Sequence, residues 1–185
     1  MNITHPQTAR LRLRPWTTHD SAGFARLNAD ARVMRHFPAV LTAPQSDALL
    51  ARFMAHWAEH GWGPWAMELR DSGRFLGVVG LAVPAHPLPF SPCVEIFWRL
   101  DADYWGQGLV PEAAAEVVRQ GFAERGLDNI VAFTTPDNRQ SWRVMEKLGM
   151  TRRGEFMHPA LPAGDPLCRH VLYQLDRASW QQGKR

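Results

Sequence analysis

The chain has 185 residues, 45% of them hydrophobic, with 21 Lys and Arg against 18 Asp and Glu. This length predicts one domain over residues 1–185, and the mild formal charge of +3, without a block of like charge, argues against a nucleic-acid partner. The two cysteines are distant in sequence, which argues against a disulfide framework or a thiolate zinc site. The sequence shows no signal-peptide pattern and no apolar run of roughly 20 residues, so we expect a cytoplasmic protein with no membrane partner.

The N-terminal part of the chain predicts a strand followed by helices. The run "RLRLRPW" from Arg10 alternates apolar and basic residues, which is typical of a half-buried strand. The next segment places Phe24 and Leu27 on one helix face. A longer helix is expected over "APQSDALLARFMAHWAEHG", where apolar residues recur at helical spacing and Gly61 offers a left-handed end.

The remainder of the chain predicts most of a sheet and two further helices. Three short runs, "PWAMELR", "RFLGVVGLAV" and "CVEIFWRLD", are separated by turn residues and predict an antiparallel meander. A helix follows Gly108, and "NIVAFTTP" predicts a buried strand. The run "NRQSWRVMEKLG" predicts a short helix capped by Asn138 and ended by Gly149, and "RHVLYQL" predicts a last strand.

The run "YWGQGLVPEAAAEVVRQGF" from Tyr104 places two glycines directly before an amphipathic helix. The first N–H groups of a helix have no intrahelical partner, and glycines allow a phosphate to approach the backbone closely. The helix dipole also favours negative charge, so this turn suits a pyrophosphate. A tight turn without a ligand is the alternative, because an isolated Gly-x-Gly is a weak signal. The run fits neither a Walker loop nor a Rossmann fingerprint.

Two longer runs, "VEIFWRLDADYWGQGLVPEA" and "TPDNRQSWRVMEKLGM", resemble the acetyl-CoA signature of the GNAT superfamily of N-acetyltransferases. The likeness is to its Rim-type branch, which includes bacterial ribosomal-protein N-terminal acetyltransferases, and it covers nearly the whole chain in element order. It implies a mixed α/β GNAT fold, with a mostly antiparallel central sheet that is flanked by helices on both faces and splayed where acetyl-CoA enters. It also implies an enzyme that transfers acetyl from acetyl-CoA to a primary amine without a metal.

The resemblance assigns residues to the reaction centre and to the cofactor. Glu95 stands where several family members carry a carboxylate base, and Ser141 stands where Rim-type enzymes place a hydroxyl beside the coenzyme A sulfur. A salt-bridged carboxylate and a small packed serine are the structural alternatives. The strand, the phosphate turn and the second helix would supply the cofactor contacts: Phe97, Trp98, Arg99, Leu100, Trp105, Gly106, Gln107, Gly108, Leu109, Val110, Asn138 and Arg143.

The acceptor side of the site is defined by fewer residues. His158 and His170 flank the proline-rich run "HPALPAGDPLCRH", and the resemblance implies a loop over the acceptor pocket. Purely structural histidines are the alternative. The amine acceptor stays open between a protein N-terminus, an amino acid, an aminoglycoside and a polyamine, and the chain could act as a monomer or a homodimer.

Two other classes of function stay open at this point. The run "HWAEH" matches His-x-x-Glu-His, so His56, Glu59 and His60 could belong to a zinc hydrolase. Such a site lacks an obvious third ligand, because Gly61 ends the helix at once. A non-catalytic acyl-CoA sensor would keep the phosphate turn without the chemistry.

Overall fold

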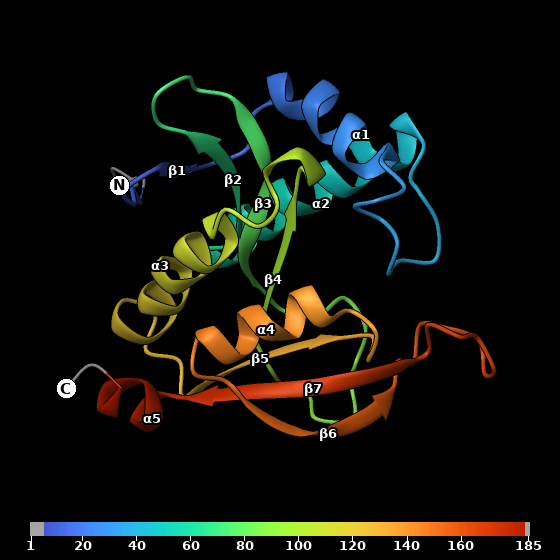
Figure 1. Cartoon of the computed structure of the whole chain (residues 1–185), viewed down its shortest axis with the longest axis vertical. Coiled ribbons are helices and arrows are strands. Elements are labelled where there is room, and N and C mark those ends of the chain that lie inside the picture. The colour runs from blue at the N-terminus through green and yellow to red at the C-terminus, as the bar shows by residue number, and fades with distance from the viewer. Residues whose placement is uncertain (1–5, 184–185) are drawn as a thin grey trace.

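A computed structural model describes residues 6–183 and shows a seven-stranded mixed sheet flanked by helices, as the resemblance implied (Figure 1). The strands are β1 (Leu11–Arg14), β2 (Pro64–Leu69), β3 (Phe75–Ala82), β4 (Glu95–Leu100), β5 (Asn129–Thr134), β6 (Thr151–Met157) and β7 (Arg169–Asp176). The α-helices are α1 (Ser21–Ala29), α2 (Ala43–His60), α3 (Leu109–Ala123), α4 (Arg139–Lys147) and α5 (Arg177–Gln182). Two 3₁₀ helices, η1 (Thr18–Asp20) and η2 (Ala102–Tyr104), precede α1 and α3.

The sheet has the order β1-β2-β3-β4-β5-β7-β6, and its pairs are antiparallel except for β4 with β5. The predicted meander of β2, β3 and β4 is confirmed. Strands β4 and β5 pair at one register position, Glu95 with Val131, and then diverge. The predicted splay is therefore present, and the edge of β4 that faces β5 is unpaired over most of its length.

The two faces of the sheet carry separate cores, because side chains alternate along each strand. On one face, Phe24 of α1 and Phe53 of α2 pack in a buried cluster with Val78 of β3. On the other face, Val117 of α3 and Met145 of α4 belong to a second cluster. In Figure 1, α2 accordingly passes behind β3, whereas α3 and α4 lie in front of the sheet.

Two elements are absent from the sequence prediction, β6 and α5. Strand β6 pairs with β7 at the edge of the sheet and is mostly exposed, so its polar residues show no apolar alternation. Helix α5 has only six residues and follows β7 directly. Both elements depend on contacts with β7 rather than on a periodic pattern of their own.

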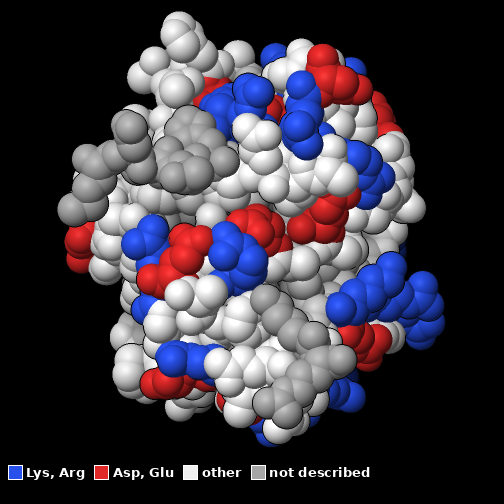
Figure 2. All heavy atoms as spheres, turned by 90° about the vertical axis from the view of Figure 1, so that its left-hand side faces the viewer, with Lys and Arg blue, Asp and Glu red and all other residues white. Residues whose placement is uncertain are grey.

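The surface carries charges of both signs. Figure 2 shows basic and acidic side chains interspersed on the face that lies at the left of Figure 1. On α3, for example, Arg119 pairs with Glu116 and with Glu124. Of the helices that the structure describes, none combines the length and the apolar character needed to cross a bilayer.

Candidate active site

A cavity of about 1290 Å³ lies where β4 and β5 diverge. Its lining comes from β4, the start of α3, α4, α2, and the segment 30–42 that joins α1 to α2. Pockets for a single small ligand usually measure roughly 300–1,000 Å³. The cavity therefore has room for a cofactor arm together with a second substrate.

The glycine turn at the start of α3 has the backbone that the sequence predicted. Gly106 and Gly108 adopt left-handed φ angles of 76° and 75°, and Gly108 is the N-cap of the helix. Residues with a Cβ rarely adopt such angles, so both glycines are required by the turn itself. The side chain of Val110 is buried in the α3 core, which leaves the outer side of the turn to its backbone N–H groups.

An arginine from the N-terminal strand region braces this turn. The Arg10 guanidinium donates to the Gln107 carbonyl at 2.8 Å and pairs with the Glu112 carboxylate at 2.7 Å. Partial burial opposes ionisation of Glu112, but hydrogen bonds from Thr8 and Arg10 hold the pKa of this carboxyl below its usual value. The turn is therefore fixed by side chains remote in sequence, and the acidic residue in the first turn of α3 is neutralised.

The free edge of β4 borders the cavity between Glu95 and the phosphate turn. Phe97, Trp98, Arg99 and Leu100 all line the cavity. The Leu100 carbonyl is already occupied, because the Trp105 indole N–H donates to it at 2.9 Å. Because N–H and C=O groups alternate between the two edges of a strand, those of Phe97 and Arg99 face β3, and the groups left for a ligand come mainly from Trp98.

Glu95 lies at the start of β4 and lines the cavity. Among the described residues, no cation lies within ion-pairing distance of its carboxylate. Burial therefore acts unopposed and raises the pKa of Glu95 to about 7. This arrangement does not fit the salt-bridged alternative, and it gives a carboxylate that can exchange a proton at neutral pH.

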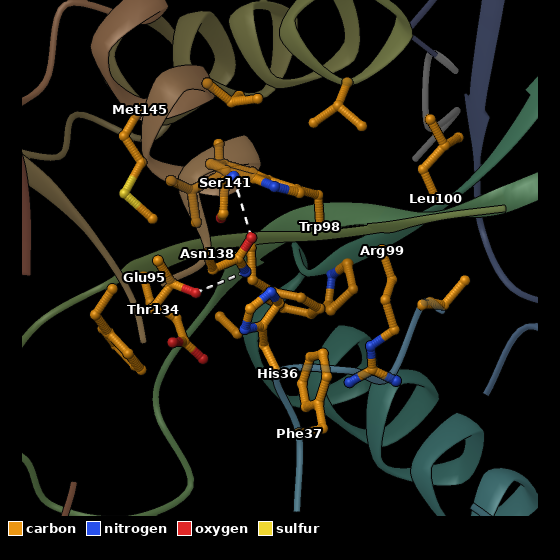
Figure 3. A pocket seen from close by; sticks show the side chains of 18 of the residues that line it. His36, Phe37, Glu95, Trp98, Arg99, Leu100, Thr134, Asn138, Ser141 and Met145 are labelled. Atoms are coloured by element: carbon orange, nitrogen blue, oxygen red, sulfur yellow. Dashed lines mark hydrogen bonds between the residues drawn. The ribbon is translucent and has the colours of Figure 1, made fainter. Parts of the chain in front are cut away.

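Asn138 and Ser141 lie at the N-terminus of α4, and a dashed line joins them in Figure 3. The Asn138 side chain accepts from the Ser141 backbone N–H at 3.3 Å and donates to Thr134 Oγ1 at 2.9 Å. The predicted cap is therefore confirmed, and it ties α4 to the end of β5. Ser141 lines the cavity, and among the described residues its hydroxyl has no hydrogen-bond partner. Arg143, one turn further from the cap, is exposed and also lines the cavity.

A family model described as "Acetyltransferase (GNAT) domain" matches residues 10–151, from the start of β1 past the end of α4. The match covers most of the chain and includes the glycine turn, Glu95 and the start of α4. The chain belongs to the GNAT acetyltransferase family.

Individual relatives agree with this family. The uncharacterized N-acetyltransferase YnaD of Bacillus subtilis is 28% identical over 177 residues, which are 95% of this chain and 99% of YnaD. A GNAT-family acetyltransferase from Bacillus anthracis has a TM-score of 0.79 at 25% identity, over 95% of this chain and 99% of that one. The aminoglycoside acetyltransferase AAC(6')-Ib, solved in complex with coenzyme A, shares the fold at TM-score 0.74 and 19% identity, over 95% and 99% of the two chains. The protein is therefore an acetyltransferase with a GNAT fold.

The two C-terminal histidines form one wall of this GNAT cavity. The His158 and His170 rings lie 5.1 Å apart and pack with Phe133 and Phe156. Burial lowers the pKa of both imidazoles, so both are neutral at pH 7. The structure thus brings the two predicted residues together beside the cavity, as an aromatic cluster.

The His-x-x-Glu-His run has a structural role in this GNAT fold. His56 Nε2 accepts from the Val83 N–H at 3.1 Å, which leaves Nδ1 to donate to the Trp62 carbonyl at 3.0 Å. Both ring nitrogens are therefore engaged by the backbone and neither is available as a metal ligand. Within residues 6–183, no group of three His, Cys, Asp or Glu is placed to hold a metal ion.

The sequence did not predict three contacts beside the cavity, of which two involve the segment 30–42 and one involves α1. His36 is hydrogen-bonded to Thr135 Oγ1 at 3.0 Å and so links this segment to the residue after β5. Phe37 lies against the Arg99 guanidinium, with 4.3 Å from Cζ to the ring centroid. The side chain of Arg99 also reaches Asn28 of α1. No motif or periodicity in this segment signals these contacts.

Proposed function

We propose that this GNAT enzyme transfers acetyl from acetyl-CoA to the primary amine of a protein N-terminus or a small molecule, by direct attack of the amine on the thioester. The observation that carries the proposal is the free edge of β4, which diverges from β5 after one register pair. An extended pantetheine arm can pair with that edge as an additional strand. The glycine turn then lies at the end of the same strand, where the pyrophosphate of acetyl-CoA would bind.

Cofactor contacts in this proposal come mostly from backbone. The turn Gly106–Val110 presents helix-start N–H groups to the pyrophosphate, and the dipole of α3 favours its charge. The Trp105 indole N–H closes the turn by its hydrogen bond to the Leu100 carbonyl. Arg143 is exposed and can reach a phosphate. Asn138 shapes the site as the α4 cap. Trp105 and Ser141 also stand at Rim-type positions, so we place the chain in that branch.

Glu95 acts as the general base. An amine attacks only when neutral, and a carboxylate with a pKa of about 7 can take its proton at physiological pH, directly or through water. The Trp98 backbone N–H polarises the thioester carbonyl, since it lies on the unpaired edge of β4. The new C–N bond then forms as the C–S bond breaks, and the amine proton passes to Glu95.

Ser141 stabilises the leaving thiolate. Its hydroxyl has no partner among the described residues and lies in the first turn of α4, where the helix dipole favours a negative charge. A serine hydroxyl is a weak acid, so its contribution is a hydrogen bond to sulfur rather than full proton transfer. His158 and His170 wall the acceptor side of the same cavity.

Titration calorimetry with acetyl-CoA, dephospho-CoA and NAD tests the cofactor part of the proposal. We expect one-to-one binding of acetyl-CoA and no heat from NAD; failure of acetyl-CoA to bind would refute the phosphate turn. A panel of primary amines, followed by release of free thiol, tests the reaction. Normal acetyl-CoA binding without turnover of any amine would instead favour the sensor.

A further inference from the structure

Arg99 carries a charge on the acceptor side of the cavity without an acidic partner. Strand alternation places Arg99 on the face of β4 shared by Glu95 and Phe97, and Phe97 packs against Phe53 of α2. Its Nε is buried and has no hydrogen-bond partner among the described residues, and no carboxylate there forms an ion pair with it. Burial lowers the pKa of Arg99 to about 10, so the guanidinium remains charged at neutral pH.

A buried polar network orients this guanidinium. Arg99 Nη1 donates to the side-chain oxygen of Asn28, and the Asn28 amide donates to Ser46 Oγ at 2.9 Å. Asn28 and Ser46 are completely buried in α1 and α2. The Phe37 ring covers one side of the guanidinium plane, at 4.3 Å from Cζ. Three segments of the chain therefore hold Arg99 in place while leaving its charge unneutralised.

The network leaves one donor of the guanidinium for a ligand. Nη1 is committed to Asn28 and Nε is buried, so Nη2 is the group that can donate to an oxygen of a carboxylate. A cation taken partly out of water is costly unless an anion or acceptors compensate for the lost hydration. The described residues supply no carboxylate to Arg99, so an oxyanion on a bound ligand would be the complementary group.

We infer that the acceptor is an amine that also bears a carboxylate or similar oxyanion, and that Arg99 binds this group. The inference rests on the proposed function, because Glu95 marks where the amine reacts. Figure 3 shows Arg99 beside Phe37, with Glu95 across the cavity near Thr134. Four residues along a strand separate the two Cα atoms by about 13 Å, so amine and oxyanion lie several bonds apart, as in an extended peptide.

Other charges on this side of the cavity agree with an anionic acceptor. Arg35 and Arg52 also line it, and both are exposed; they outnumber Glu59, the exposed carboxylate of α2 in the same lining. A polyamine or an aminoglycoside would bring several positive charges toward these arginines and Arg99, which costs binding free energy. The inference therefore separates the four acceptor classes left open by the sequence, and it favours a peptide or an ω-amino acid.

Matched acceptors with and without the oxyanion test this inference. Triglycine, about 10 Å long when extended, and 6-aminohexanoate would each be compared with the corresponding uncharged amide. For wild type we expect kcat/KM to favour the carboxylate by about tenfold or more. Arg99→Gln should reduce this preference to about one without changing KM for acetyl-CoA, and Arg99→Lys should keep part of it. Arg26→Gln, which removes an exposed arginine of α1, should leave it intact.

A binding measurement separates this inference from the proposed reaction. Hexanoate and hexanamide would be titrated into the coenzyme A-loaded protein by ligand-observed NMR, with thermal melts to show that the variants fold. Hexanoate should bind more tightly than hexanamide, and the difference should vanish in Arg99→Gln. Equal binding of the two probes, or equal turnover of the matched acceptors, would overturn the inference. Selective hexanoate binding with no amine acetylated would instead overturn the proposed reaction.

Discussion

The substitution Glu95→Gln tests the general base, because the amide keeps the shape of the side chain but cannot accept the proton. With a pKa of about 7, the carboxylate is about half ionised at pH 7, about one-tenth at pH 6 and about nine-tenths at pH 8. General-base catalysis typically contributes about 10²–10⁴-fold. We therefore expect kcat/KM of the variant to fall by at least about a hundredfold at pH 8, and the deficit to shrink by about tenfold at pH 6.

The assay is the initial rate of free thiol release from acetyl-CoA, followed from about pH 6 to about pH 8 with one amine acceptor. The ratio of wild-type to variant kcat/KM is the quantity to plot, because the ionisation of the amine itself cancels. Glu124→Gln, at an exposed carboxylate after α3 that pairs with Arg119, is the matched control and should give a ratio near one throughout. A ratio for Glu95→Gln that is independent of pH would refute the assignment.

The same substitution has a consequence for folding. The pKa of Glu95 rises from 4.5 to about 7 on folding, so the folded state binds the proton more tightly than the unfolded chain. This stabilisation is complete below about pH 4.5 and is lost as the pH rises to about 7. Glu95→Gln should therefore increase the free energy of unfolding by up to about 3 kcal/mol at pH 8 and change it little at pH 4. Urea melts giving equal differences at both pH values would contradict the burial argument.

Two further substitutions test the cofactor side. Ser141→Ala should lower kcat by about tenfold to a hundredfold, because a hydrogen bond to the thiolate is lost, while calorimetry should show unchanged acetyl-CoA affinity; normal turnover would rule out the role at sulfur. Gly108→Val should abolish acetyl-CoA binding, because valine disfavours the left-handed φ of 75° that the turn requires. Gly61→Val introduces similar strain after α2, away from the turn, and should still bind; full binding by Gly108→Val would contradict the phosphate site.

Secondary structure was predictable where a segment buries one face. Strand β1 alternates buried and half-buried residues, and α2 begins at a Thr42 capping box and ends at Gly61 with a left-handed φ of 70°. Strand β6 is different, because within the described part of the chain it pairs with β7 alone, at the edge of the sheet, and its residues are mostly exposed. Strand β6 forms because it pairs with β7, and its own residues show no alternating pattern that predicts a strand.

The candidate site divides in the same way. Gly108 and Asn138 were predictable because a turn or a cap fixes each within a few neighbouring residues. The partner of Arg99 is 71 residues away in sequence, so no local spacing could reveal it. At His56 the local spacing suggests a function that the structure does not support. The spacing resembles that of a zinc site, but the imidazole is hydrogen-bonded to backbone groups of Trp62 and Val83.

Strand β4 separates the two substrates of the proposed reaction. Trp98 and Leu100 lie on the side of α3 and α4, near Ser141, whereas Glu95 and Arg99 face α1 and α2 (Figure 3). The thiolate would therefore leave on the α4 side and the amine approach from the other, meeting where β5 diverges. In the proposed reaction, backbone of the continuous segment 97–110 would form most of the cofactor site, whereas side chains from separate segments, including β4, the segment 30–42 and β7, would form the acceptor site. A short sequence motif can therefore predict which cofactor the chain binds, whereas the residues that would bind the acceptor come together only in the folded chain.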